Sequence, residues 1–165
     1  MADIINSKLL DTGILNVQDA CIVIVKTEWN AVIVDELEKG CIKTLGEHSV
    51  KQIKTIVVPG AIEIPFAIKQ YWELHHGLFE RPESRPTAFI ALGCVIRGGT
   101  PHFEYVSKYV TEGILQLNLS LSVPTIFGIL TVDNESQAKE RIGGIHGHKG
   151  EEAAITALKM INLLG

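Results

Sequence analysis

The segment "TAFIALGCVIRGGTPHFEYV", residues Thr87–Val106, passes from an apolar run through two glycines into a Thr-Pro pair and a helical pattern. A short, nearly continuous run of branched and apolar residues is typical of a parallel strand that is covered on both faces. The glycines and the Thr-Pro pair predict a tight corner followed by the start of a helix. The segment therefore predicts a strand–loop–helix unit, the building block of α/β proteins.

The same unit recurs along the chain. Apolar runs with the same character are "CIVIV" (Cys21–Val25), "IKTIVV" (Ile53–Val58) and "PTIFGILT" (Pro124–Thr131). Helical spacing is found in Asn30–Leu45, Pro65–Leu74 and Pro101–Leu121, and in the shorter segments Glu135–Arg141 and Glu151–Leu163. The inward positions are expected to be Ile33, Leu37, Cys41 and Leu45 in the first helix, and Phe103, Val106, Val110, Leu117 and Leu121 in the third. This order predicts right-handed crossovers and a four-stranded parallel sheet between two layers of helices.

Length and composition indicate one globular domain. The chain has 165 residues, of which 46% are hydrophobic and 21% charged, enough to bury one core. The segment His75–Pro86 contains two prolines and mixed charge without a period, and is expected to be a surface loop. We therefore expect residues 1–165 to form a single domain.

Charge and cysteine content exclude several classes of protein. The net charge is -4 and the charges are scattered, which argues against a nucleic-acid partner. Cys21, Cys41 and Cys94 each lie in an apolar run, so neither a disulfide framework nor a CxxC site is expected. The N-terminus lacks a basic, apolar secretion signal, and no apolar run approaches the ~20 residues of a membrane helix. A cytoplasmic protein without a membrane partner is expected.

Unusual residues follow the ends of the four predicted strands, as "KTEWN", "PGAIEIP", "VIRGGTPH" and "TVDN". Ligands of parallel sheets bind beyond the carboxyl ends of the strands, where the helix N-termini point. In "RGGTPH", the two glycines leave the backbone open, Thr100 suits the N-cap and Pro101 the first helical position. This pattern fits either an anion site or an ordinary capped turn. His102 is either a proton carrier or a surface residue.

Other residues near these ends also have two interpretations. Glu63 either complements a helix dipole or accepts hydrogen bonds from a polar ligand. Trp29 is either an aromatic plate at the mouth of the first strand or a cap over the core, and Phe127, within a strand, is expected in the core by default.

The segment "RIGGIHGHKGEEAA" near the C-terminus contains four basic side chains among four glycines: Arg141, His146, His148 and Lys149. A zinc site needs three or four ligands, and these residues do not supply them, so no metal is expected. The alternative is an exposed, glycine-rich connector whose cations suit a phosphate. Motifs for dinucleotides, nucleoside triphosphates, serine hydrolases and zincins are absent from the sequence.

Five motifs, taken in order, resemble those of the lumazine synthase family over nearly the whole chain. They are Trp29-Asn30, "PGAIEIP" at 59–65, "VIRGGTPHFEYV" at 95–106, "PTIFGILT" at 124–131 with Gln137-Ala138, and "KGEEAA" at 149–154. The resemblance implies a three-layer αβα sandwich with a flavodoxin-like sheet, which a short N-terminal strand can join in the oligomer. Ile62 replaces a frequent aromatic, "HGHKG" replaces His-Asn-Lys-Gly, and the loop Leu78–Arg85 is longer than in compact members.

The resemblance also implies a reaction: condensation of 5-amino-6-(D-ribitylamino)uracil with 3,4-dihydroxy-2-butanone 4-phosphate to 6,7-dimethyl-8-ribityllumazine, with release of phosphate and water and without cofactor. His102 is implied to transfer protons. The implied pyrimidine and ribityl contacts are Trp29, Asn30, Ala61, Ile62, Glu63, Cys94, Val95, Ile96 and Phe127. The implied phosphate contacts are Gly99, Thr100, Arg141 and Lys149.

The family further implies a homopentamer whose sites are shared between neighbours, with decamers or sixty-subunit capsids as larger assemblies and riboflavin synthase as a functional partner. Two other functions remain compatible with the fold. A flavin- or lumazine-binding module needs neither proton transfer nor a phosphate site, so His102 and Arg141 argue against it. A structural role as a shell protein is the second; shell formation is compatible with catalysis, so it would be an additional function.

Overall fold

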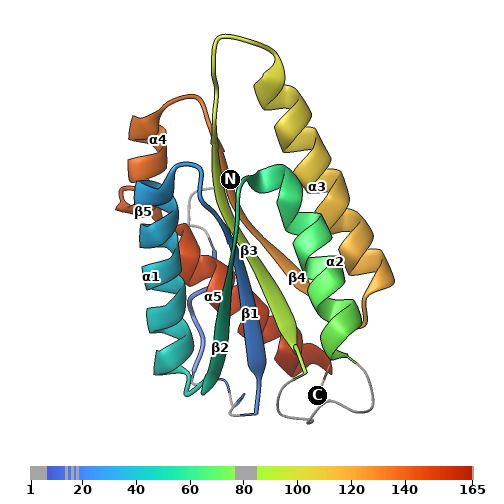
Figure 1. Cartoon of the computed structure of the whole chain (residues 1–165). Helices are drawn as coiled ribbons and strands as arrows, with labels where there is room; N and C mark the ends of the chain where they lie inside the picture. Colours follow the sequence, from blue (N-terminus) through green and yellow to red (C-terminus); the bar gives the residue numbers. More distant parts are fainter. Residues whose placement is uncertain (1–6, 14, 16, 18, 77–84, 165) are drawn as a thin grey trace.

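The computed structural model describes residues 7–13, 15, 17, 19–76 and 85–164. Four parallel strands form one sheet in the order β2-β1-β3-β4, as Figure 1 shows. Their bounds are β1 Cys21–Thr27, β2 Gln52–Val58, β3 Ala88–Ile96 and β4 Thr125–Val132. This order is that of the flavodoxin-like fold, so the predicted architecture is confirmed.

Helices cover both faces of the sheet (Figure 1). The helices α1 (Ala31–Glu47) and α5 (Lys149–Leu164) lie on one face, and α2 (Ile64–His75) and α3 (His102–Ser120) on the other. A short 3-10 turn, η2 (Ala61–Glu63), leads into α2, and α4 (Glu135–Lys139) follows β4. A small antiparallel hairpin, β5 (Ile142–Gly144) and β6 (Gly147–His148), precedes α5.

Alternate strand residues supply two separate cores. On β1, Ile22 and Ile24 face the core under α1 and α5, while Val23 and Val25 face the core under α2 and α3. Strand β3 divides in the same way, with Ile90 and Leu92 on the first side and Phe89 and Ala91 on the second. The central strands are apolar over most of their length, Cys21–Val25 in β1 and Ala88–Ile96 in β3, because both of their faces are buried.

The edge strands depart from the expected burial. Val57 of β2 is exposed, and Phe127 of β4 is 39% exposed. The expectation that all four strands are covered on both faces is therefore correct for β1 and β3 but wrong for β2, and Phe127 is not a core residue. An edge strand can have an apolar sequence without being enclosed by its own chain.

The predicted helix positions are correct for α1, whose four expected inward residues are all buried. In α3 the expectation for Phe103 is wrong, because its ring is only partly buried and lies under the guanidinium of Arg97. Ile114 occupies an inward position that the pattern did not identify. The expected short N-terminal strand is not assigned to particular residues, and residues 1–6 lie outside the described part of the chain, as does most of the loop Leu78–Arg85.

The glycine-rich segment before α5 forms the β5–β6 hairpin, whose residues 143–145 are exposed. Helix α5 begins at Lys149, two residues earlier than expected, so that Lys149 is buried and only 4% exposed. The expectation of an exposed cation at this position is therefore wrong. The hairpin brings the chain back against α1, where the start of α5 packs.

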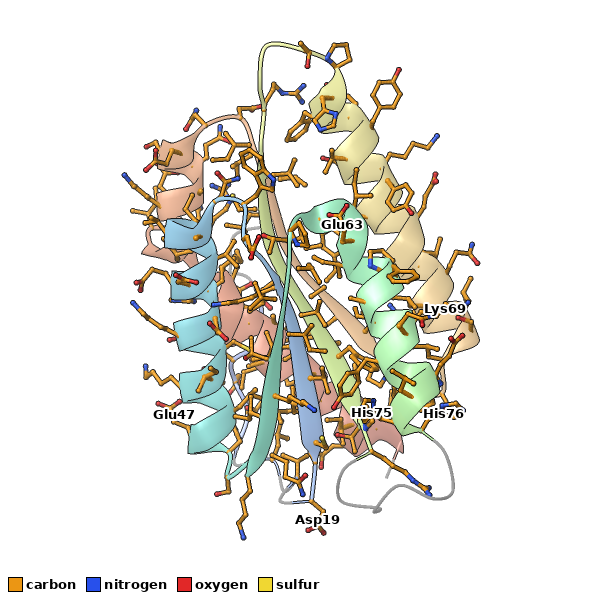
Figure 2. The ribbon with its side chains drawn as sticks, viewed as in Figure 1. Asp19, Glu47, Glu63, Lys69, His75 and His76 are labelled. Carbon is orange, nitrogen blue, oxygen red and sulfur yellow. The ribbon has the colours of Figure 1, made fainter. Side chains whose placement is uncertain are left out.

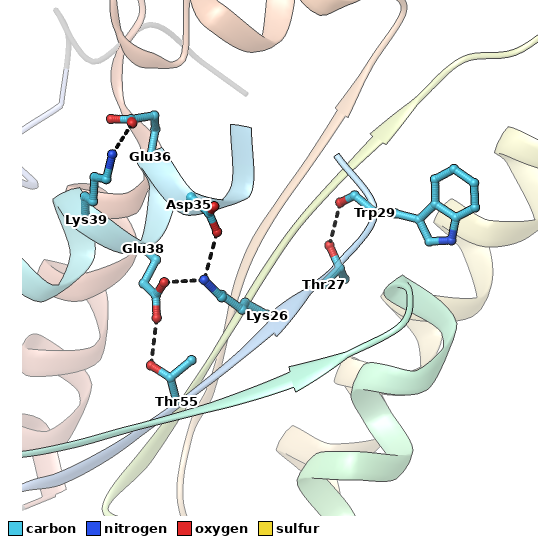
Figure 3. A network of polar contacts seen from close by, with 8 residues as sticks. All are labelled: Lys26, Thr27, Trp29, Asp35, Glu36, Glu38, Lys39 and Thr55. Atoms are coloured by element: carbon cyan, nitrogen blue, oxygen red, sulfur yellow. Dashed lines mark hydrogen bonds and ion pairs between the residues drawn. The ribbon is translucent and has the colours of Figure 1, made fainter. Parts of the chain in front are cut away.

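A network of charges connects α1 to the sheet (Figure 3). Lys26 Nζ on β1 donates to Asp35 Oδ1 at 2.8 Å and also to Glu38, whose other carboxylate oxygen accepts from Thr55 Oγ1 of β2 at 2.7 Å. Partial burial opposes the charged form of Lys26, but the two carboxylates outweigh it and raise the pKa above the ordinary value for lysine. The amine therefore stays charged at neutral pH and holds three elements together.

Helix α5 approaches the backbone of α1 closely at Gly150. A methyl group at this position would lie 2.0 Å from the carbonyl oxygen of Leu37, which is backbone and cannot rotate away. We expect Gly150→Ala to lower the free energy of unfolding by about 1–3 kcal/mol, the usual cost of overpacking a core. Urea unfolding at matched protein concentration measures this loss.

Gly46→Ala is the matched control, because it also adds one methyl group to a helix. No described atom lies within 4 Å of that added carbon. Alanine stabilises a helix interior relative to glycine by roughly 0.5–1 kcal/mol, so this variant should be neutral or slightly more stable. Equal effects of the two substitutions would contradict the close approach at Gly150.

Candidate active site

A cavity of about 420 Å³ opens at the carboxyl edge of the sheet, where the ends of β1 and β3 meet η2 and the start of α3. Its volume is in the range usual for sites that bind small molecules. Its lining residues are Thr27, Trp29, Asn30, Gly60, Ala61, Ile62, Glu63, Cys94, Val95, Ile96, His102 and Val106. The structure thus brings together all the residues expected to contact the pyrimidine and ribityl groups, except Phe127, and adds His102.

Trp29 forms one wall of this cavity. Its side chain is 73% exposed, so it does not cap the core. The hydroxyl of Thr27 donates to the Trp29 carbonyl at 3.1 Å, and the Trp29 amide donates to Pro59 at 3.2 Å. Figure 3 shows the indole projecting beyond the end of β1. The backbone is held while the ring remains available for stacking.

Glu63 lies beside Trp29, across Gly60. A methyl group on Gly60 would be 3.1 Å from Glu63 Oε2 and 3.5 Å from Trp29 Cδ1. The glycine therefore allows the carboxylate and the indole to approach each other. Glu63 stands at the start of α2, as Figure 2 shows, where the helix dipole favours a negative charge.

Asn30 connects two strands at the rim of the cavity. It adopts the left-handed conformation (φ 59°), and its Nδ2 donates to the carbonyl oxygen of Cys94 at 2.8 Å. The pairing of β1 with β3 ends at Lys26 and Leu92, so β1 no longer supplies a partner beyond that point. The amide of Asn30 takes over this role, and its orientation is fixed because only its NH₂ group can donate to a carbonyl.

The thiol of Cys94 is buried, and this burial raises its pKa to about 11. The thiolate is the nucleophilic form of cysteine, so the side chain is unreactive at neutral pH. Cys94 lines the cavity without offering a reactive thiolate.

The corner between β3 and α3 carries His102 as the first residue of the helix, with its ring bordering the cavity. The expectation that Thr100 caps this helix is wrong. Pro101 occupies the N-cap position, and among the described side chains none caps it. Gly98, Gly99 and Thr100 are exposed, so a ligand can reach the backbone of this corner.

Phe127 and Lys149 lie in a different hollow, a groove of about 680 Å³ between β4 and α5. Phe127 pairs with Ala91, whereas the β3–β4 pairing continues to Ile96 and Val132. Five residues along a strand span about 16 Å, which places Phe127 far from the carboxyl edge of its own sheet. Lys149 Nζ donates to both oxygens of Glu152, at 2.6 and 2.8 Å.

Arg141 follows α4 and lines neither hollow. Its guanidinium donates to the carbonyl of Gln137 at 2.7 Å, and Glu140 lies 3.8 Å away. His148 packs its ring against Gly40, and its Nδ1 is buried without a partner among the described residues. Within the described ranges, no three His, Cys, Asp or Glu side chains gather as a metal site would require.

Comparison with known proteins identifies the family. The family model described as 6,7-dimethyl-8-ribityllumazine synthase matches residues 19–165. The chain belongs to the lumazine synthase family. Its members are transferases, so the chain is assigned to that class of enzyme.

The similar proteins named 6,7-dimethyl-8-ribityllumazine synthase include the following three. The Porphyromonas gingivalis protein is 48% identical over 148 residues, which cover 88% of this chain and 86% of the relative. The Parabacteroides distasonis protein is 47% identical over 141 residues, covering 84% and 82%. The Bacteroides fragilis protein is 43% identical over 143 residues, covering 86% and 94%.

Three residues of the cavity were not identified from the sequence: Thr27, Gly60 and Val106. Thr27 could have been identified from its hydroxyl at the end of a buried strand, whereas Gly60 and Val106 have the character of ordinary turn and core residues.

In the part of the chain that the structure describes, no helix of this lumazine synthase family member is long and apolar enough to cross a membrane.

Proposed function

We propose that the chain condenses 5-amino-6-(D-ribitylamino)uracil with 3,4-dihydroxy-2-butanone 4-phosphate to give 6,7-dimethyl-8-ribityllumazine, phosphate and water in riboflavin biosynthesis. The observation that supports this is the cavity at the carboxyl edge, which unites an aromatic plate, a carboxylate and an imidazole in one space. These three groups match a flat heterocycle, a polyol chain and a proton transfer. Membership of the lumazine synthase family makes the same reaction the first candidate.

In this proposal Trp29 stacks on the pyrimidine, and the backbone of Cys94, Val95 and Ile96 meets the uracil edge. Asn30 holds this stretch of backbone in place through its hydrogen bond to the Cys94 carbonyl. Ala61, Ile62 and Glu63 hold the ribityl chain, with the carboxylate accepting hydrogen bonds from its hydroxyls. The backbone amides of the exposed residues Gly99 and Thr100 take one side of the phosphate.

His102 is the proposed proton carrier. Imine formation needs a proton on the departing hydroxyl, and elimination of phosphate needs a proton removed from carbon. An imidazole can serve in both directions near neutral pH. We propose no metal or cofactor, because an aromatic amine and a ketone can condense by proton transfer alone.

Assay of the purified protein with both substrates tests the proposal directly. We expect fluorescence of the lumazine product to appear only when both substrates are present, together with release of inorganic phosphate. Tight binding of the lumazine without turnover would instead indicate a binding module.

We further propose that each site is completed by a neighbouring copy of this chain in a homopentamer. Phe127 lies about 16 Å along β4 from the carboxyl edge of the sheet, and Phe127 and Lys149 line a groove that is separate from the cavity, so they do not close it within one chain. In a head-to-tail ring, two different surfaces of the same chain face each other at every interface. Phe127, Arg141 and Lys149 then form the second wall, with Arg141 as the main phosphate ligand because Glu152 already balances the charge of Lys149.

The shared site can be tested by mixing two inactive proteins. His102→Ala and Arg141→Ala chains, unfolded together and refolded at equal ratio, should recover activity, because some interfaces join an intact His102 to an intact Arg141. Random mixing in a heterologous ring restores about a quarter of the sites. Activity that stays at the level of the single variants, in rings shown by mass spectrometry to be mixed, contradicts a shared site. Each variant refolded alone is the control.

We also propose that pentamers of this chain can form larger assemblies, as decamers or capsids of sixty chains, and that the protein is functionally coupled to riboflavin synthase. We propose further that residues 1–165 form a single domain and that the protein is cytoplasmic.

A further inference from the structure

Arg97, the residue that follows β3, makes three contacts with its guanidinium. Its Nε donates to Asp133 Oδ1 at 2.8 Å, and its terminal nitrogen forms an ion pair with Glu104. The same group lies over the ring of Phe103, 4.2 Å from the ring centre. Arg97 is thus bound to three side chains from two other parts of the fold.

These partners lie on either side of the corner that carries His102. Asp133 directly follows β4, while Phe103 and Glu104 directly follow His102 in the first turn of α3. Backbone hydrogen bonds anchor the corner at its ends, from Arg97 to Val132 at 2.9 Å and from Glu104 to Pro101 at 3.1 Å.

The middle of the corner has little packing of its own. It consists of Gly98, Gly99 and Thr100, all exposed. No described atom would lie within 4 Å of a methyl group on either glycine. Two adjacent glycines also allow a wide range of backbone angles. The place of His102 relative to the cavity therefore depends on what fixes the two ends.

The charge of Arg97 is already paired within the chain. One guanidinium faces two carboxylates, so its charge is already balanced within the chain. The ion pair lowers the pKa of Glu104, which keeps the carboxylate charged at neutral pH. Arg97 is consequently a poor candidate for binding the substrate phosphate, although it stands next to the exposed corner.

We infer that Arg97 is a positioning residue that holds His102 and the amides of residues 98–100 in their catalytic arrangement. Its effect on turnover rests on the proposed function, whereas its effect on the order of the corner does not. The side chain is 43% exposed, and exposed ion pairs contribute little to global stability. The function of the contacts is then to fix geometry, which matters because small displacements of a catalytic group are costly.

The test compares Arg97→Ala and Arg97→Lys with the control Lys39→Ala, which removes an exposed ion pair to Glu36 on α1. Hydrogen–deuterium exchange of the peptide that covers residues 97–104 should be about tenfold faster in Arg97→Ala, with the melting temperature and other peptides unchanged. Arg97→Lys should be intermediate, because an ammonium cannot form the planar fork or the same stacking. Lys39→Ala should match the wild type.

Steady-state kinetics give the second measurement. For Arg97→Ala we expect kcat to fall about tenfold and the KM for the butanone phosphate to rise, with the KM for the pyrimidine unchanged. Unchanged exchange at residues 97–104, exchange that rises throughout the protein, or local loosening with full turnover would each overturn the inference. If the wild type forms no lumazine, the proposed function fails, while the exchange data still decide whether Arg97 orders the corner.

Discussion

His102→Ala is expected to lower turnover by tens-fold to hundreds-fold while leaving the protein folded. Positioned acid–base groups typically contribute about 10²–10⁴-fold. The loss should be near the low end because an aromatic amine and a ketone react readily once they are held together. The side chain is exposed at the start of α3, so its removal leaves no cavity in the core. Initial rates of lumazine fluorescence at saturating substrate measure the effect.

His76→Ala is the matched control for this variant. His76 is also exposed and directly follows α2, at the end of the helix opposite Glu63, as Figure 2 shows, far from the carboxyl edge. We expect it to retain full turnover. A His102→Ala protein as fast as this control would exclude the imidazole from the reaction.

Glu152→Ala is expected to destabilise the fold by about 3–5 kcal/mol, the usual cost of leaving one member of a buried ion pair without its partner. The ammonium of Lys149 is 4% exposed, and both oxygens of Glu152 accept from it. Removing the carboxylate leaves a cation in a groove lined largely by apolar side chains. Urea unfolding at fixed protein concentration measures the loss.

Two further variants separate burial from charge. Glu135→Ala breaks an ion pair of similar length, 2.8 Å to Lys139, but both of its members are exposed, so stability should hardly change. The double variant Lys149→Met/Glu152→Ala removes both charges and should be more stable than Glu152→Ala alone. A single variant as mild as Glu135→Ala would show that water or another group compensates the lysine.

The sequence predicted the sheet and its helices because each strand contains a run of apolar residues and the helices have a clear inner face. The same logic failed at the edges. Val57 and Phe127 have the composition of core residues, but their strands lie at the two borders of the sheet. Apolar character indicates that a residue avoids water in the functional protein, and it does not say whether its own chain covers it.

Most of the cavity could be predicted because its residues follow strand ends, and parallel strands place these ends at one edge. Lys149 could not be placed in this way. The helical pattern after it starts at Glu151, and only the structure shows that α5 begins two residues earlier and turns the lysine inward. Likewise, no pattern shows that Arg97 pairs with Asp133, which is 36 residues distant in the sequence.

The network around Lys26 also determines how the strands align. Because β1 is apolar on both faces, sliding it by one residue would exchange two sets of aliphatic side chains between the two cores at modest cost. The slide would also turn Lys26 away from Asp35 and Glu38, toward the core under α2 and α3, whose buried members are all apolar. A buried, unpaired cation is strongly unfavourable. Lys26 therefore makes the shifted strand register much less stable, whereas the surrounding aliphatic side chains alone would allow it.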